Sequence, residues 1–242
     1  YKVSSHFLVA LLMLMAIEVR AVDAADGRLY SLDLYGLDDP ALANALNAYH
    51  EGQLADSRPV LEGVLKAFPE FEGRHSLALI LGDIATRSGD PVGAEAYLMK
   101  ASAYPPLQNV ALARLSKLLR SKGDEEGALE SLHAITPGSP QYAIARYDSA
   151  VLLMQREQMN EAFSDAQDAL MEASSDQERE RAKILLADIL LKKGDEEQSG
   201  KLLKNLWWER PDNEADVVSR LQKIGRMPSD SEILLRDLSA LS

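Results

Sequence analysis

The sequence contains no cysteine. A chain without thiols has no disulfide framework, no thiolate metal site, no nucleophilic cysteine and no lipidated lipoprotein cysteine. Its stability must therefore come from packing. With 46% hydrophobic residues, the 242-residue chain has enough apolar side chains for one long core or two shorter ones.

Positive charge is also scarce. Lysine and arginine total 26 against 38 aspartates and glutamates, which gives a net charge of -12. Nucleic-acid binding draws its affinity from clustered cations, so we expect no nucleic-acid partner. The four histidines lack the spacing of metal ligands, and no phosphate-binding loop or nucleophile motif is present. The sequence therefore predicts no cofactor and no catalytic site within this chain.

An apolar run near the start of the chain is too short to cross a bilayer, which takes about 20 residues. The run Phe7–Ile17 has 11 apolar residues, follows Lys2 and precedes small residues around Ala21 and Ala24. This order is typical of a secretory signal peptide. We predict a signal peptide over residues 1–24 and a linker over 25–39. We also expect export, to a bacterial periplasm, and no membrane span after cleavage.

A phrase of residues recurs at a spacing of 34. It comprises a Gly-Asp pair, an alanine five residues after the glycine, and a proline twelve residues later; its two clearest copies begin at Gly89 and Gly123. Looser copies begin at Gly52 and Gly194. Repeats of this length are helical hairpins that stack on one another.

Five copies of the phrase share a small residue near the start of the second helix, at intervals of 37, 34, 34 and 37 residues. A larger side chain at this place would force the two helices of a hairpin apart. These anchor residues are Ser57, Ala94, Ala128, Ala162 and Ser199. The position four residues later lies on the same helix face and is assigned to the core; it holds Leu61, Leu98, Leu132, Ala166 and Leu203.

The fourth copy departs most from the pattern. It has Glu157-Gln158 in place of the Gly-Asp pair and Ser174 in place of the proline. Glycine in the left-handed conformation ends a helix, and aspartate caps the next one. We therefore expect the fourth turn to be the least well capped, with Asn160 as the replacement cap.

The end of the chain follows a different pattern. Residues 212–223 predict a helix that ends at Gly225, and Ser229 or Asp230 can cap a last helix that runs through Leu241. The last helix keeps an apolar face that still needs a partner. We interpret residues 212–242 as capping helices or the start of a further repeat.

The second copy carries the clearest family resemblance. It resembles the tetratricopeptide repeat (TPR) family at Leu81-Gly82, Gly89-Asp90, Ala94, Leu98, Ala101 and Pro106. The likeness extends over residues 40–211. It implies an all-α, right-handed α-solenoid of about five TPR-like helical hairpins with C-terminal extra helices. It also implies that first helices line a concave face that binds a protein or peptide.

The resemblance places candidate ligand-binding residues on that concave face. They are Asp83, Arg87, Lys117, Arg120, Tyr147, Val151, Met154 and Asp188. The middle of this set is basic and the following part is apolar, which suits an acidic or mixed extended peptide. An ordinary solvated face is the other interpretation.

The segment around Trp207-Trp208 carries a second resemblance. With Pro211 and Pro228-Ser229 it is similar to the helical scaffold of soluble lytic transglycosylases. That resemblance implies a peptidoglycan-cleaving domain beyond residue 242. Our first hypothesis is an exported, non-catalytic scaffold for protein or peptide binding in the cell envelope, and this enzyme scaffold is the second.

Overall fold

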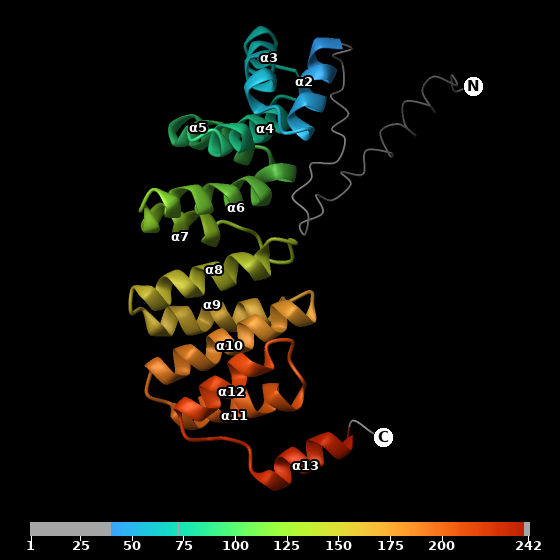
Figure 1. Ribbon diagram of the computed structural model, residues 1–242. Helices are drawn as coiled ribbons and strands as arrows, with labels where there is room; N and C mark the ends of the chain where they lie inside the picture. The colour runs from blue at the N-terminus through green and yellow to red at the C-terminus, as the bar shows by residue number, and fades with distance from the viewer. Residues whose placement is uncertain (1–39, 72, 240–242) are drawn as a thin grey trace, which may run out of the picture. The chain divides into compact units, whose positions relative to one another are not determined.

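The computed structural model describes residues 40–71 and 73–239, which form twelve helices and no strand (Figure 1). The predicted signal peptide and linker, and Leu241, lie outside these residues. The described chain falls into two compact units that divide within α6 (Pro105–Ser121), after Leu118. We refer to them as the N-terminal unit and the C-terminal unit.

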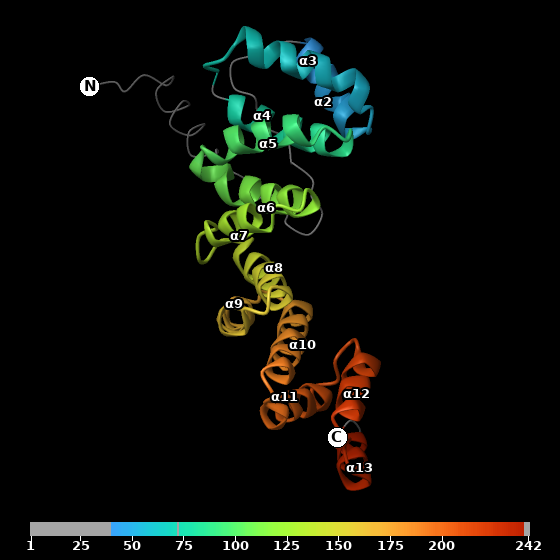
Figure 2. The ribbon, with the colours of Figure 1, turned by 90° about the vertical axis from the view of Figure 1, so that its left-hand side faces the viewer.

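The N-terminal unit contains two helical hairpins and most of α6. The first hairpin pairs α2 (Pro40–His50) with α3 (Leu54–Ala67), and the second pairs α4 (Arg74–Arg87) with α5 (Pro91–Ser102). Figure 2 shows α4 and α5 running side by side. Helix α3 also packs against α4, which joins the two hairpins.

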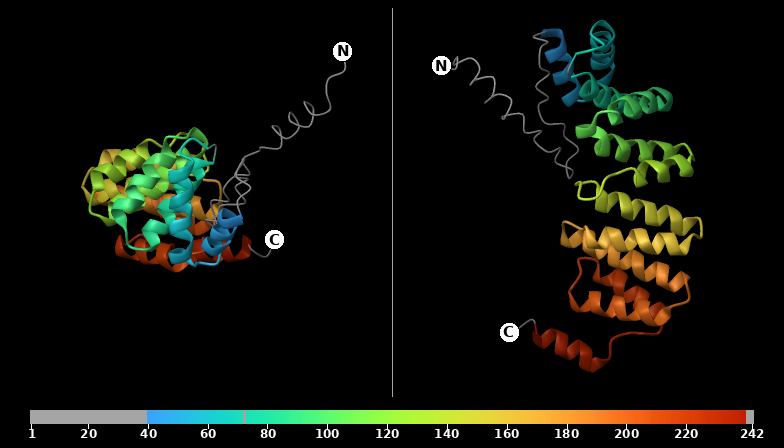
Figure 3. Two further views of the ribbon diagram at one scale, coloured as in Figure 1. Left: turned by 90° about the horizontal axis from the view of Figure 1, so that it is seen from above. Right: turned by 180° about the vertical axis from the view of Figure 1, so that it is seen from behind.

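The C-terminal unit continues the same pattern. Helix α7 (Glu125–His133) packs on the hairpin of α8 (Tyr142–Gln155) and α9 (Met159–Met171), and α9 packs on α10 (Asp176–Lys192). Helix α10 pairs with α11 (Glu196–Trp208), which contacts α12 (Glu214–Lys223), and α13 (Asp230–Ser239) comes last (Figure 3). The predicted all-α solenoid of helical hairpins with extra C-terminal helices is confirmed.

The small anchor residues lie where the repeat pattern predicts. All five have no exposed surface, and the residues four positions later are at most 3% exposed. In the second hairpin Gly82 allows an especially close crossing. A Cβ atom added at Gly82 would lie 2.8 Å from Cδ2 of Leu98, a buried side chain of the facing helix. The Leu-Gly pair of the repeat pattern therefore permits tight packing of α4 on α5.

The turns within the hairpins use the predicted glycine and aspartate. Gly89, Gly123 and Gly194 have φ values of 74°, 81° and 82°. The following aspartates cap the second helices, since Asp90 and Asp124 accept hydrogen bonds of 2.9 and 3.0 Å from backbone N–H groups three residues later. Asp195 does the same in the fifth hairpin.

The fourth turn keeps the backbone shape without the glycine. Glu157 takes a φ of 61°, a left-handed conformation that costs a non-glycine residue energy. The residue that caps α9 is Gln158, and its side chain makes no capping hydrogen bond. The prediction that Asn160 replaces the cap is wrong, because α9 already begins at Met159 and the Asn160 amide oxygen accepts from Lys193.

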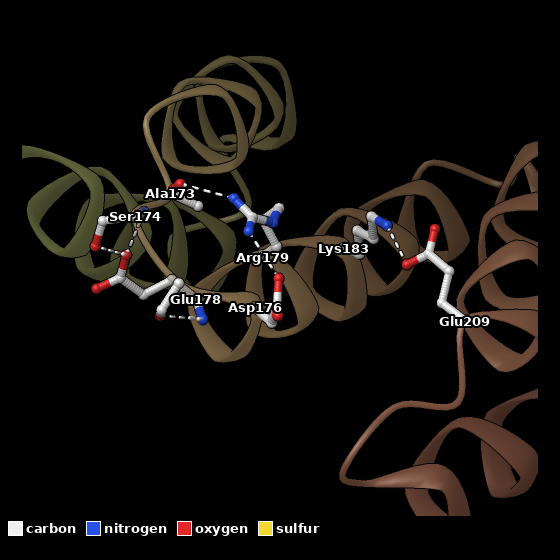
Figure 4. Close-up of polar contacts among 8 residues, drawn as sticks. Ala173, Ser174, Asp176, Glu178, Arg179, Lys183 and Glu209 are labelled. Atoms are coloured by element: carbon white, nitrogen blue, oxygen red, sulfur yellow. Dashed lines mark hydrogen bonds and ion pairs between the residues drawn. The ribbon is translucent and has the colours of Figure 1, made fainter.

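The fourth hairpin also lacks the terminal proline, and an arrangement similar to a capping box takes its place. The Glu178 backbone N–H donates to the Ser175 hydroxyl at 3.2 Å. The Glu178 carboxylate in turn accepts from the Ser174 backbone N–H at 2.8 Å (Figure 4). These two hydrogen bonds satisfy one backbone N–H within the first turn of α10 and one just before the helix. The polar sequence of this segment therefore serves to begin a helix.

Polar side chains connect neighbouring hairpins at about one repeat spacing. The Tyr49 hydroxyl donates to Asp83, 34 residues away, and the Arg58 guanidinium donates to Asp90, 32 residues away. Further pairs at 32 to 35 residues are Glu62 with Tyr97, Asn160 with Lys193, Glu180 with Asn213 and Asp188 with Arg220. These pairs fix the register of one hairpin on the next.

The tryptophan pair lies at the junction of α11 and α12. Trp207 is 4% exposed and belongs to a core with Leu203, Val217 and Leu221, whereas Trp208 is 38% exposed. The two rings meet edge to face at 5.5 Å. One ring therefore covers the junction with the next helix, and the other remains half exposed.

Candidate functional site

The first helices of the hairpins carry all eight candidate ligand-binding residues. Helices α4 and α6 hold the first four, with Arg120 just past the division within α6. Helices α8 and α10 hold the other four in the C-terminal unit. In each unit, we call the side of these helices that carries the candidates the first-helix surface of that unit.

Asp83 lies at the centre of a polar cluster in the N-terminal unit. Its Oδ2 atom accepts a hydrogen bond of 2.9 Å from the Tyr49 hydroxyl on α2 and lies 3.5 Å from Arg87 Nη1. Its Oδ1 atom lies 3.8 Å from Arg114 Nη1 on α6. Burial, aided by the nearby Asp83 carboxylate, raises the pKa of Tyr49 to about 12. The Asp83 carboxylate thus interacts with three side chains: the Tyr49 hydroxyl and the guanidinium groups of Arg87 and Arg114.

The predicted cations of this region point into solvent. Half of the Arg87 side chain, 49%, is exposed although it pairs with Asp83. Lys117 and Arg120 are exposed and lie three residues apart on α6, so they share one side of that helix. Helix α6 therefore presents two cations that an acidic ligand can reach.

An apolar row follows on α8. Tyr147, Val151 and Met154 are half-buried and lie at positions i, i+4 and i+7, which share one helix face. Their side chains are apolar apart from the tyrosine hydroxyl. This row can accept apolar side chains of a ligand while the polar groups around it fix the ligand's direction.

The carboxylate of Asp188 is already bound by a side chain of the same unit. Arg220 on α12 donates from Nε and Nη2 to the two Asp188 oxygens, at 2.8 and 3.0 Å. Arg220 also pairs with Asp216 one turn earlier, and these hydrogen bonds raise the pKa of Arg220. Asp188 therefore joins α10 to α12 and reaches a ligand only as part of an ion pair.

Sequence reasoning missed the partners of both acidic candidates. Tyr49 and Arg114 flank Asp83, and Arg220 lies on Asp188. A signal for them was present, because each lies about one repeat length from its aspartate. Polar residues spaced by one repeat can face each other when hairpins stack.

Histidine, serine and aspartate, the residue types of a hydrolytic triad, meet in the C-terminal unit. They do not have the arrangement that catalysis requires. Nε2 of His133 lies 2.9 Å from both the Ser149 hydroxyl and Asp165 Oδ2. The Ser149 hydroxyl is fully buried and donates directly to Asp165 at 2.5 Å. A catalytic triad places the imidazole between serine and carboxylate, with the hydroxyl open to substrate. The cluster instead binds α7, α8 and α9 together.

Metal sites and membrane-spanning helices are two further features that the described residues lack. No group of three or more histidines and carboxylates in residues 40–71 and 73–239 is arranged to hold a metal ion. Within the same ranges, no helix combines the length and apolar character that a membrane crossing requires.

The fold is similar to solved structures of repeat proteins. No protein-family model matches the sequence, and no curated protein matches it significantly. A TPR protein from Parabacteroides merdae ATCC 43184 aligns with a TM-score of 0.61 and 20% identity, over 76% of this chain and 73% of that one. MamA aligns with a TM-score of 0.59 and 18% identity, over 73% of this chain and 92% of that one.

A third similar structure is YrrB, described as a TPR protein with an unusual peptide-binding site. It aligns with a TM-score of 0.57 and 15% identity, over 76% of this chain and 91% of that one. At these identities the likeness concerns the backbone. The buried anchors, the Gly-Asp turns and these structural matches together show that the chain has the fold of tetratricopeptide repeat proteins.

Proposed function

We propose that the chain is an exported scaffold that binds a protein or peptide on the first-helix surface of its C-terminal unit. The observation that carries this proposal is the half-buried row of Tyr147, Val151 and Met154 on α8. A row of this kind offers apolar contacts at successive points along one line. An extended peptide can place its apolar side chains on such a line. The peptide-binding site named for YrrB, which shares the fold, supports the same class of ligand.

The charges beside the row define the ligand further. Arg120 is an exposed cation of the same unit, whereas the carboxylate of Asp188 is neutralised by Arg220. On the first-helix surface of the C-terminal unit, Asp188 is thus less available to a ligand than Arg120. We expect the ligand to be an extended segment with apolar side chains and at least one carboxylate.

Site-specific crosslinking in the native cell tests this proposal. A photoreactive amino acid at Val151 or Met154 should give discrete adducts with one protein partner. Gln167, an exposed position on the second helix α9, is the matched control. Equal adducts from Val151 and Gln167, or no adducts from Val151 and Met154, would show that the partner does not bind at this surface.

The export part of the proposal rests on the order of Lys2, the apolar run Phe7–Ile17 and the small residues after it. We expect residues 1–39, fused to a reporter enzyme that is active only after export, to give activity. Replacement of Leu11 and Leu12 by arginine should abolish it. Retention of the native fusion inside the cell would contradict export.

The described residues offer no support for the second interpretation, a scaffold of a soluble lytic transglycosylase that acts on peptidoglycan.

A further inference from the structure

Arg236 is the buried residue of helix α13, and it attaches the helix to the rest of the C-terminal unit. Its guanidinium carbon lies 4.2 Å from the centre of the Trp207 ring, and it forms two hydrogen bonds with the Glu214 carboxylate, one of them 2.9 Å long. Arg210 donates to the Arg236 carbonyl oxygen at 2.7 Å. A buried cation, rather than an apolar seam, thus anchors this helix.

A second ion pair attaches the same side of α13. Lys204 Nζ on α11 lies 3.1 and 3.2 Å from the two oxygens of Glu232. Glu232 also accepts from the Ser229 backbone N–H at 2.7 Å, which caps α13. Glu232 and Arg236 are four residues apart and therefore share one helix face. That face determines how α13 is oriented.

Two leucines of α13 lie away from the attached face, and Leu235 lies at its border, three residues after Glu232. Leu234 and Leu238 are two residues from Arg236, which places them at about 200° around the helix from it. They are 62% and 54% exposed, and the neighbouring Leu235 is 59% exposed. Large apolar side chains grouped on one exposed surface are typical of an interaction site. Because Arg236 and Glu232 fix the helix, this leucine row is held outward.

Helix α12 offers a comparison within the same unit. It buries Val217 and Leu221, and its exposed positions Asp216, Ser219 and Gln222 are polar. A polar outer face of this kind is what ends a helical array in solution. Helix α13 comes after α12 in the ribbon (Figure 1). It presents exposed leucines in place of polar residues.

The charges around the leucine row indicate the kind of partner. The exposed charged residues of α13 are Asp230 and Asp237, whereas its one cation, Arg236, is buried against Glu214. The whole chain carries a net charge of -12. A second copy of this chain would bring like charges together, and a cationic partner would oppose them.

We propose that the outer face of α13, comprising Leu234, Leu235 and Leu238 with Asp230 and Asp237 beside them, docks an amphipathic helix of another protein. The partner helix carries apolar side chains on one face and lysine or arginine along its borders. This docking site is separate from the first-helix surface and does not depend on ligand binding there.

Fluorescence anisotropy with model peptides tests the proposal on the full chain. The probe is a labelled 18-residue peptide of leucine and lysine, with the leucines on one helical face. We expect it to bind at least tenfold more tightly than a scrambled peptide of the same composition. L234S/L238S, which leaves every charge in place, should weaken binding at least tenfold. V92S/M171S, which changes two side chains that are 75% and 74% exposed elsewhere, should leave binding unchanged.

Charge selectivity is tested with a second variant. D230K/D237K should favour a leucine–glutamate peptide of the same pattern over the leucine–lysine peptide. The proposal is overturned if L234S/L238S binds the cationic peptide like the native chain, or if the native chain binds both peptides equally. Sedimentation that shows a dimer abolished by L234S/L238S would make a second copy the occupant instead.

Discussion

Arg220 on α12 binds both carboxylate oxygens of Asp188 on α10, at 2.8 and 3.0 Å, across 32 residues of sequence. The pair thus joins first helices one repeat apart. Arginine suits this place because its planar guanidinium donates two parallel hydrogen bonds to one carboxylate. The same ion pair lowers the availability of Asp188 to a ligand and holds the end of the array in place.

Removal of this pair should loosen α12. The side chains of Arg220 and Asp188 are 22% and 31% exposed, so water screens the pair only in part. We expect Asp188→Asn to lower the free energy of unfolding by about 1 kcal/mol. Hydrogen exchange should show the loss first in α12. Lys201→Gln, which breaks a pair whose side chains are 69% and 66% exposed, is the control and should cost less than about 0.5 kcal/mol.

The left-handed Glu157 gives the second prediction. Its φ of 61° matches the turn glycines of the other hairpins, and only glycine takes this conformation without steric cost. We expect Glu157→Gly to raise the free energy of unfolding by about 1 kcal/mol. The neighbouring Arg156 has a φ of -84°, so Arg156→Gly should destabilise the protein. Urea unfolding that ranks the two variants the other way would contradict this account of the turn.

Two helical glycines give opposite predictions for the same substitution. Gly63 on α3 has no atom within 4 Å of an added Cβ, so Gly63→Ala should stabilise the helix by up to about 1 kcal/mol. An alanine Cβ at Gly82 would lie 2.8 Å from the buried Leu98 side chain, and Gly82→Ala should cost about 1–3 kcal/mol. A double-mutant cycle with Leu98→Ala should show coupling, since the truncated side chain relieves the clash. If the two substitutions changed the free energy of unfolding in a strictly additive way, the explanation by close packing of Gly82 on Leu98 would be wrong.

Much of the fold was predictable because each helix crossing requires a small residue at a fixed position of the repeat. Ser57 and Ser199 occupy anchor positions and are fully buried although serine is polar, which shows that size decides there. The Ser199 hydroxyl donates to the Ala187 carbonyl, which satisfies it inside the core. The anchor interval therefore located every hairpin.

The candidate site was less predictable for a physical reason. Which side chain neutralises Asp83 or Asp188 depends on how one hairpin docks on the next, and a repeat pattern does not specify rotamers or ion pairs. His133 illustrates the same limit. Its contacts with Ser149 and Asp165 bring three helices together. Asp165 lies 32 residues away, about one repeat spacing, but Ser149 lies 16 residues away, a spacing that the repeat does not predict as a contact.

The attachment of α13 should weaken in acid. The Ser229 backbone N–H and hydroxyl, with Lys204, lower the pKa of Glu232 from 4.5 to about 2, and Arg236 lowers the pKa of Glu214. Both pKa values are lower in the folded chain, so their contribution is complete above about pH 4.5 and is lost as the pH falls toward about 2.

Hydrogen exchange across that range measures the effect. The amides of α13 should lose protection before those of α9, because α13 depends on these carboxylates. Glu232→Gln should weaken protection of α13 at neutral pH and reduce its dependence on pH. Uniform loss of protection in both helices would show that global unfolding, rather than release of α13, governs the response.

The exposed cations of α6 give the last prediction. Lys117 and Arg120 lie on one side of the helix, where an acidic ligand can approach them. We expect Lys117→Glu/Arg120→Glu to lower the affinity for an acidic partner segment at least tenfold, measured by calorimetry with the segment identified by crosslinking. Lys66→Glu/Lys201→Glu makes the same change in net charge at exposed positions on second helices and should reduce affinity less than threefold. Equal losses in the two variants would mean that overall charge, and not the first-helix surface, attracts the partner, since an effect of net charge depends little on where the charges lie.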